Sequence, residues 1–327
     1  MHNPLVLRSR ATSSRNGGLM PAVYRKLKLV FETVDSRLRN CDYFHFVDCR
    51  RDARLLVCLL VSDQAELWPH VIPRFEAALP DADVCVVSQG MHSEYLEGLC
   101  ASKAWSYLWT TTDDTSLAQN ICYGLHPAAQ LIIKVDDNVF VVRDTLRSLV
   151  DEHHRFKSDG VIDPGFLAPV SPLNGACYRL VLDRLGCLEE YEARFGRARL
   201  ASVGTALQND PAAAQWIWER TIPLERTAAR MASSAQDHVL SPIQFNTGLI
   251  LFERAFWQEF GHFPVYRRRL VAGFCTDGLD EFHFCTRSIS ASRPMVITMR
   301  SFAARFAHCG QYEGMRATML VRPQLFN

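Results

Sequence analysis

Between residues 53 and 135 the chain alternates continuous apolar runs with segments whose apolar residues recur at helical spacing. The runs are typical of strands that are buried on both faces of a sheet. They lie at 53–63, 82–90, 104–111 and 130–135. The segments 65–79 and 93–103, which separate the first three runs, read as helices. This alternation predicts an α/β fold with a mostly parallel central sheet and helices on both faces.

One further helix is predicted before the last of these runs. Ser116 and Gln119 have the spacing of a capping box, so the helix is expected to begin at Ser116 and to end before Pro127. The strand at 130–135 follows, and its carboxyl end carries a polar triplet. The triplet consists of Asp136, Asp137 and Asn138. Ligands of open α/β sheets bind outside the carboxyl ends of the strands, so the triplet marks a predicted binding site.

The regular alternation weakens after about residue 165. A turn-rich stretch follows, then 183–235 is largely helical, and 245–263 reads as a strand with a short helix. The remaining elements are predicted at 278–288, 294–299 and 305–312. No internal repeat and no linker rich in Pro, Gly or Ser divides this sequence. We therefore predict one domain over 51–327, with a helical insert at 183–235.

Residues 1–50 differ in pattern from this domain. Residues 1–20 are expected to form a disordered arm, and 21–50 a helical extension. Within the extension, 21–39 has apolar residues at a helical period beside basic residues. This pattern suits a helix packed on the domain, which we favour, or a peripheral membrane contact. No window reaches the roughly 18 to 20 apolar residues of a membrane span, and no signal peptide is recognised. The sequence predicts a cytoplasmic protein.

Composition narrows the possible partners. The chain has 327 residues, 48% of them hydrophobic, and its 36 Lys and Arg nearly balance 35 Asp and Glu. Nothing in this balance argues for nucleic acid as a partner. The 11 cysteines are scattered without a C-x-x-C pair, which makes a disulfide framework or a zinc knuckle unexpected. We interpret them as reduced residues, most of them in the core.

The polar triplet has a chemical interpretation and a structural one. Carboxylate and amide oxygens at a strand end suit Mg²⁺ or Mn²⁺ bound together with substrate phosphates. The segment is not an EF-hand loop, because Val141 stands at the sixth position and Arg147 at the twelfth. Alternatively, Asp136 and Asp137 simply end the strand and cap the next segment. Taken alone, the triplet does not decide between these interpretations.

The order of motifs resembles the nucleotide-sugar half of the GT-A fold glycosyltransferases, especially the large family 2 group. In that family a helix motif reads like "ARNxG" and the next strand ends in a D-x-D motif. Here Asn120 and the triplet stand at the matching places, and "KVDDNVFV" looks like the "DDDVFV" stretch of galactosyltransferase-like families. Farther along, "NTGLILFERAFWQEFGHF" is similar to "GxxxxFRRxxWEEVGGF". "GLDEFHFCTR" then looks like "GGEDxxxxxR", with Asp280 and Glu281 as the acidic pair and Arg287 as the arginine.

The resemblance implies an inverting transfer of a sugar from a nucleotide-diphosphate sugar to a hydroxyl on a glycan, lipid-linked or protein acceptor. It implies a donor half at 51–150 and an acceptor half at 165–315. Glu281 is then the expected general base, because a sugar hydroxyl must lose its proton to attack the anomeric carbon. The resemblance also implies that Asp280 is a second catalytic residue and that Asn120, Asp136 and Asp137 bind the donor. It implies Asp137, Asn138 and His308 as ligands of Mn²⁺ or Mg²⁺, and Trp257 and Arg287 as acceptor-binding residues. Alternatively, Asp280 and Glu281 form an exposed acidic turn at a helix start.

Two departures from the family pattern leave alternatives open. Where the family has an Asp that contacts the base, this chain has Gln89 in "SQG", and Asp63 is a candidate substitute. At the end of the triplet, Asn138 contributes no charge to a metal site. An inactive nucleotide-sugar-binding protein is therefore one alternative. A sugar nucleotidyltransferase is another, although "VSDQAELWP" lacks the Gly-rich, basic phosphate loop expected after the first strand of such an enzyme.

Overall fold

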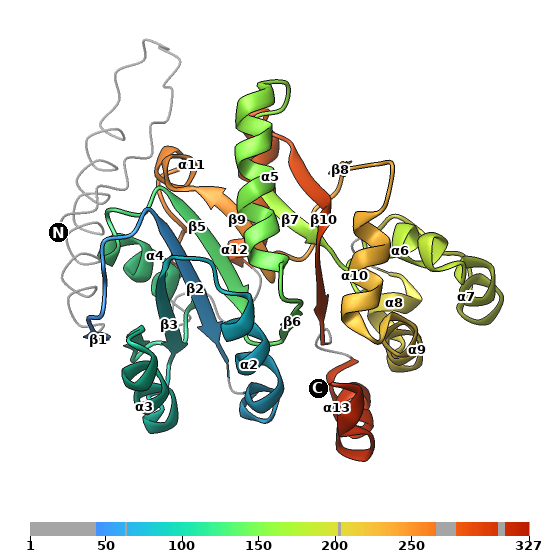
Figure 1. The fold of residues 1–327 in the computed structure, drawn as a ribbon, viewed down its shortest axis with the longest axis horizontal. Coiled ribbons are helices and arrows are strands. Elements are labelled where there is room, and N and C mark those ends of the chain that lie inside the picture. The colour runs from blue at the N-terminus through green and yellow to red at the C-terminus, as the bar shows by residue number, and fades with distance from the viewer. Residues whose placement is uncertain (1–43, 63, 202–203, 266–278, 307–310, 327) are drawn as a thin grey trace, which may run out of the picture.

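A computed structural model describes residues 44–62, 64–201, 204–265, 279–306 and 311–326 (Figure 1). The predicted arm, the predicted helix at 21–39, and the site candidates Asp63 and His308 lie outside the described residues. None of the helices within the described residues has the length and apolarity needed to cross a membrane.

The first half of the sheet is formed by the strands that the apolar runs predict. Its four parallel strands are β2 (Leu55–Val61), β3 (Asp83–Gln89), β4 (Ser106–Thr110) and β5 (Leu131–Asp136). They lie in the order β4-β3-β2-β5, and β1 (Phe44–Val47) pairs with β4 in the antiparallel sense. Helices α2 (Trp68–Ala78), α3 (Glu94–Lys103) and α4 (Thr115–Leu125) connect these strands. The predicted α/β fold with a parallel central sheet is confirmed.

The second half of the sheet contains strands of both directions. Beside β5 lie β9 (Leu249–Glu253), β7 (Phe166–Val170), β10 (Met295–Arg305) and β6 (Val139–Val141), in that order, while β8 (His238–Ser241) also pairs with β10. Strands β7 and β10 run parallel to each other, and β9 is antiparallel to its neighbours β5 and β7. The acidic end of β5 therefore lies beside strands that come from distant parts of the sequence.

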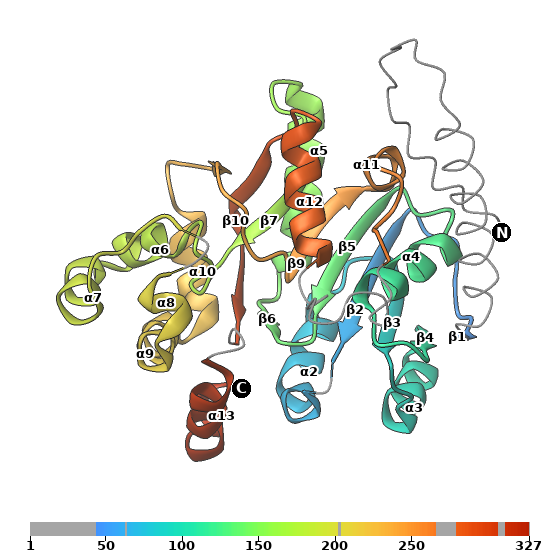
Figure 2. The ribbon, with the colours of Figure 1, turned by 180° about the vertical axis from the view of Figure 1, so that it is seen from behind.

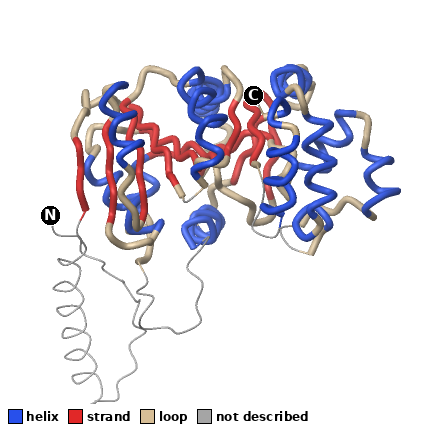
Figure 3. Tube along the Cα trace, turned by 90° about the horizontal axis from the view of Figure 1, so that it is seen from below, coloured by secondary structure: helices blue, strands red, loops and turns tan. Residues whose placement is uncertain are grey.

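Helices cover both faces of the sheet (Figures 2 and 3). Alternate residues of β2 enter different cores, as the two-residue period of a strand requires. Cys58 packs in the core beneath α4 and α12 (Leu279–Ser290), whereas Val57 packs in the core with α2 and α5 (Thr145–Asp159). The other described helices are η1 (Ala65–Leu67), α6 (Tyr178–Leu185), α7 (Leu188–Phe195), α8 (Ala206–Asn209), α9 (Pro211–Thr221), α10 (Leu224–Ala232), α11 (Arg254–Glu259), α13 (Tyr312–Val321) and η3 (Pro323–Leu325). Five of these, α6 to α10, lie in or overlap the stretch 183–235.

Three local predictions are corrected by the structure. Helix α4 is capped by Asp114, whose side chain accepts a hydrogen bond from Leu117 N at 2.9 Å, so Ser116 lies inside the helix. Residues 44–47, expected at the end of a helical extension, form strand β1. Strand β7 replaces part of the turn-rich stretch, and its Pro169 is the reason that the sequence pattern there does not read as a strand.

All eight cysteines among the described residues are free, and six of them are buried. This agrees with the interpretation of most cysteines as reduced core residues.

Candidate active site

Five charged side chains meet at the edge of the sheet where β5 ends. We call Lys134, Asp136, Asp280, Glu281 and Arg305 the charged cluster. Its members come from the end of β5, the first turn of α12 and the last residue of β10. The loop before β9, residues 246–248, supplies backbone and amide groups that hold them.

Lys134 lies at the centre of the charged cluster. Its side chain is 5% exposed, and Nζ lies 2.9 Å from Asp136 Oδ1 and 3.6 Å from Asp280 Oδ2. Nζ also donates a hydrogen bond to Thr247 O at 3.1 Å. Burial acts to lower the pKa of Lys134, but the two aspartates outweigh it and the pKa is raised. The ammonium group is therefore charged, and it joins β5 to the start of α12.

Glu281 is held through one of its two carboxylate oxygens. Oε2 accepts hydrogen bonds from Asn246 Nδ2 at 2.8 Å and from Thr247 N at 3.2 Å. Burial raises the pKa of Glu281 to about 7, although the charges of Arg305 and Lys134 act to lower it. A carboxylate with this pKa can both take up and release a proton near neutral pH.

Asp280 is held by helix α4 and by Lys134. Its side chain is 8% exposed, and Oδ2 accepts a hydrogen bond from Gln119 Nε2 at 2.8 Å. Gln119 is fixed in turn, because its Oε1 accepts from Tyr123 Oη at 2.9 Å. Asp280 therefore links the start of α12 to α4.

Asp137 turns away from the charged cluster toward the end of β2. Oδ2 accepts hydrogen bonds from Ser62 N at 2.9 Å and Trp68 Nε1 at 3.0 Å, and Oδ1 accepts from Ser62 Oγ at 3.0 Å. Burial raises the pKa of Asp137 to about 6, while these hydrogen bonds act to lower it. Both oxygens of Asp137 are thus used to tie β5 to β2 and α2.

Asn138 and Asp136 face the guanidinium group of Arg305. Arg305 Nε donates to Asn138 Oδ1 at 3.3 Å, and a terminal nitrogen of Arg305 lies 4.0 Å from Asp136 Oδ2. The oxygens that a divalent metal would need are therefore turned toward a cation, and those of Asp137 are in other hydrogen bonds. As arranged here, the described members of the predicted metal site do not form an open coordination site.

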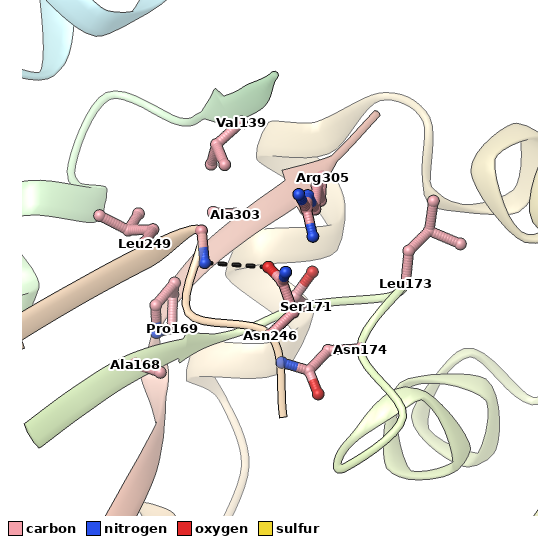
Figure 4. Close-up of a pocket in the computed structure, with 11 residues that line it drawn as sticks. Val139, Ala168, Pro169, Ser171, Leu173, Asn174, Asn246, Leu249, Ala303 and Arg305 are labelled. Carbon is pink, nitrogen blue, oxygen red and sulfur yellow. Dashed lines mark hydrogen bonds between the residues drawn. The ribbon is translucent and has the colours of Figure 1, made fainter. Parts of the chain in front are cut away.

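A small pocket opens beside the charged cluster (Figure 4). Arg305 points into it toward Asn246 and Ser171. Other lining residues are Val139, Pro169, Asn174 and Gly248. Gly248 brings the backbone close to the cluster: a Cβ there would lie 2.9 Å from Asn246 Oδ1 and 3.2 Å from Asp136 Oδ2. The pocket therefore combines a mostly apolar wall with a few side chains that can form hydrogen bonds.

Asn120 and Trp257 lie together, and their hydrogen bonds hold two segments of the fold in place. Asn120 Nδ2 donates to Phe263 O at 2.9 Å, and Asn120 Oδ1 accepts from Phe263 N at 3.0 Å and Trp257 Nε1 at 3.3 Å. Trp257 is 3% exposed and packs against Tyr123. Asn120 is predicted to contact the donor, and Trp257 the acceptor. In the structure, the polar atoms of both side chains hold α4 to the segment after α11.

Gln89 and Arg287 complete the predicted site residues. Gln89 ends β3 at the same sheet edge as Asp136, and its buried Oε1 has no hydrogen-bond partner within the described part of the chain. Arg287 is exposed and lies six residues beyond Glu281 on α12, a rise of about 9 Å along the helix axis. The structure thus places Gln89 at the same sheet edge as the site, with β2 between its strand and β5, and Arg287 away from the charged cluster.

Sequence reasoning missed Lys134, Asn246 and Arg305. Lys134 carries a signal, because a lone charge inside the apolar run "LIIKV" must find a buried partner. Asn246 and Arg305 carry none that is comparable, since an amide in a loop and an arginine at a strand end are ordinary surface residues.

Comparison with known proteins indicates resemblance at the level of fold. No protein-family model and no curated protein matches the chain. Similar solved structures include a mannosyltransferase from Pyrobaculum calidifontis in complex with GDP-Man and Mn²⁺ (TM-score 0.46, 15% identity, covering 84% of this chain and 64% of that chain). They also include GalNAc-T7 with UDP, GalNAc and Mn²⁺ (TM-score 0.46, 12% identity, 83% and 48% covered). A third is CMP:2-keto-3-deoxy-manno-octonic acid synthetase complexed with CTP (TM-score 0.41, 10% identity, 83% and 99% covered).

This chain spans about two thirds of the length of the first of these proteins and about half of the second. The structural neighbours thus include both glycosyltransferases and a nucleotidyltransferase. Their likeness to this chain concerns the fold alone.

Proposed function

We propose that this chain is a family 2-like glycosyltransferase that moves a sugar from a nucleoside-diphosphate sugar to an acceptor hydroxyl. The observation that carries the proposal is the meeting of Asp136 with Asp280 and Glu281 around Lys134. An acidic strand end and an acidic helix start lie far apart in the sequence, yet they share one buried cation at the carboxyl edge of the sheet.

Glu281 is the proposed general base. Its Oε2 is held by Asn246 and Thr247, and no contact is assigned to Oε1 among the described residues. Oε1 can therefore take the proton of the acceptor hydroxyl as its oxygen attacks the anomeric carbon. The bond to the diphosphate breaks on the opposite side of that carbon, which inverts the configuration.

Arg305 is the proposed contact for the donor diphosphate. A planar guanidinium group can bind two phosphate oxygens at once, and negative charge grows on the diphosphate as it leaves. Arg305 is 21% exposed at the pocket, whereas Lys134 is buried and acts through Asp136. Gln89 remains a proposed contact for the nucleotide, because its buried Oε1 lacks a partner within the described residues.

A bound Mn²⁺ or Mg²⁺ would neutralise the diphosphate, but the proposed reaction contains no step through it. Asn138 already accepts from Arg305, and Asp137 is used by Ser62 and Trp68. We propose that Arg305 supplies the positive charge that faces the donor. Turnover that persists after chelation of divalent metals is the expected result.

Donor binding and donor use can be measured separately. Melting temperature is recorded with UDP, GDP, CDP and ADP, since a ligand that binds the folded state raises it. One nucleotide is expected to stabilise the wild type and to lose this effect in Arg305→Met. Arg300→Met is the matched control, because Arg300 is an exposed arginine of the same strand that pairs with Asp237.

Donor use is measured as release of the nucleoside diphosphate from a panel of nucleotide sugars. Release that depends on the acceptor supports the glycosyltransferase proposal. A stabilising nucleotide without turnover on any donor and acceptor would indicate an inactive nucleotide-sugar-binding protein. Absence of both effects would overturn the proposal.

A further inference from the structure

Three thiols and an imidazole form a second cluster, beneath α4 and apart from the pocket. Cys58 on β2 and Cys85 on β3 are paired residues of adjacent parallel strands. Cys122 comes from α4, which packs on that face of the sheet, and His126 caps the end of the same helix. All four are at most 2% exposed. We call them the thiol cluster.

Ligand atoms of Cys85, Cys122 and His126 lie at distances that suit a metal ion, and Cys58 lies beside this group. One ligand atom from each of Cys85, Cys122 and His126 lies within 4.8 Å of the other two. Cys122 Sγ lies 3.7 Å from Cys58 Sγ. In a tetrahedral zinc site with Zn–S bonds of about 2.3 Å, two sulfur atoms are about 3.8 Å apart. The pair Cys58 and Cys122 already has this separation.

His126 has the hydrogen bonding that is typical of a metal-binding histidine. Nδ1 lies 2.8 Å from Cys122 O, so the Nδ1–H donates to this carbonyl and Nε2 keeps its lone pair. Nε2 is buried and has no hydrogen-bond partner among the described residues. A buried lone pair without a partner costs free energy. Histidines that bind metals commonly donate their other ring N–H to a carbonyl or carboxylate in this way.

Two arginines hold the segment that carries His126. Arg254 donates to the carbonyl oxygens of Tyr123, at 2.8 Å, and of His126. Arg50 donates to the carbonyl oxygen of Leu125. The guanidinium groups fix the end of α4, and their charges also act on the neighbouring thiols. A zinc ion with three thiolates and one imidazole has a net charge of about −1, which nearby cations stabilise.

We propose that Cys85, Cys122 and His126 bind one structural zinc ion, and that Cys58, whose Sγ lies 3.7 Å from Cys122 Sγ, completes the tetrahedron through a small movement of its side chain. Each of the three thiols loses its proton to solvent as its sulfur binds Zn²⁺, and His126 binds as the neutral ring. Thiolate and imidazole ligands favour Zn²⁺ over Mg²⁺ or Mn²⁺, so this site is distinct from any metal at the donor diphosphate. Because the cluster is buried, the ion enters while the chain folds, and it joins α4 to β2 and β3.

The test measures zinc in the purified full chain by mass spectrometry. About one equivalent of zinc is expected in the wild type and in Cys100→Ser, and clearly less in Cys122→Ser. Cys100→Ser is the matched control, because Cys100 is also a buried free cysteine but lies on α3, outside the thiol cluster. Equal zinc content in both variants would overturn the proposal.

Cobalt substitution gives a readout that does not depend on the stability of a variant. The wild type refolded with Co²⁺ is expected to show the visible bands of tetrahedral cobalt and the near-ultraviolet charge-transfer band of cobalt thiolates. If the wild type contains no zinc as purified and shows neither signal with Co²⁺, the four residues are ordinary reduced core side chains and the proposal fails.

Discussion

The end of β5 and the start of α12 each present a carboxylate whose pKa is raised by burial, but the two carboxylates are held differently. At the end of β5, Asp137 has both oxygens in hydrogen bonds with Ser62 and Trp68. At the start of α12, Glu281 is held through Oε2 alone, by Asn246 and Thr247. A carboxylate whose two oxygens both accept hydrogen bonds maintains the fold. A carboxylate with one oxygen that has no contact among the described residues can accept a proton there. We therefore expect substitutions in the two regions to have opposite consequences.

The largest expected effect is on turnover in Glu281→Gln. Glutamine retains an oxygen that can accept from Asn246 and Thr247, but it cannot take a proton. kcat/KM is expected to fall by roughly 10²- to 10⁴-fold, the usual contribution of a general base, with little change in melting temperature. Glu259→Gln, at an exposed position on α11, serves as the control. Retention of more than about a tenth of the wild-type rate would contradict the assignment.

Lys134→Met tests the cation that the two regions share. Its removal leaves Asp136 and Asp280 near each other without the ammonium group between them. Breaking such a buried arrangement is expected to lower the free energy of unfolding by about 3 to 5 kcal/mol. Urea denaturation measures this, with Lys103→Met, whose lysine forms an ion pair with Glu76 at the surface, as the control. Equal stability of the two variants would show that Lys134 is not the central support of the charged cluster.

Asp137→Ala tests the other side of the comparison. Alanine leaves the donors of Ser62 and Trp68 without their acceptor, so a loss of about 1 to 3 kcal/mol in unfolding free energy is expected. Turnover per folded molecule should stay near the wild-type value. The opposite outcome, full stability with lost turnover, would restore Asp137 to the donor or metal role that the sequence predicted.

A smaller effect is expected on the pH dependence of stability. Burial raises the pKa of Asp137 from 3.8 to about 6 and that of Glu281 from 4.5 to about 7. The folded chain therefore binds these protons more tightly than the unfolded chain. The contribution of both groups to the free energy of unfolding is fully present below about pH 4 and is lost as the pH rises to about 7. Urea denaturation at several pH values should show a shallower decline in Asp137→Asn than in the wild type. An identical slope would contradict the raised pKa of Asp137.

The first half of the sheet could be predicted from the sequence because its strands are apolar on both faces. The residues of β2 are all buried, and a continuous apolar run is the direct signature of such a strand. Strand β7 could not be predicted in the same way. Pro169 lies opposite Thr298 of β10, and proline in a sequence argues against a central strand unless its neighbours are already known.

The site also has features that could be predicted from the sequence and features that could not. Asp136, Asp280 and Glu281 could be selected from the motifs that resemble a known family. Their meeting around Lys134 depends on how β9 and β10 are inserted beside β5, and no local pattern encodes that. The direction in which Asp137 points could not be predicted either, because it depends on Ser62 and Trp68 at the end of a different strand.

The pH dependence of kcat/KM tests the central claim, that Glu281 takes the proton of the acceptor. For the wild type we predict that kcat/KM rises about tenfold per pH unit in acid and levels off above pH about 7, the pKa to which burial raises Glu281. In Glu281→Gln this rise should be absent from the residual activity. A wild-type profile that is flat from about pH 5 to 8, or a rise that persists unchanged in Glu281→Gln, would contradict the claim.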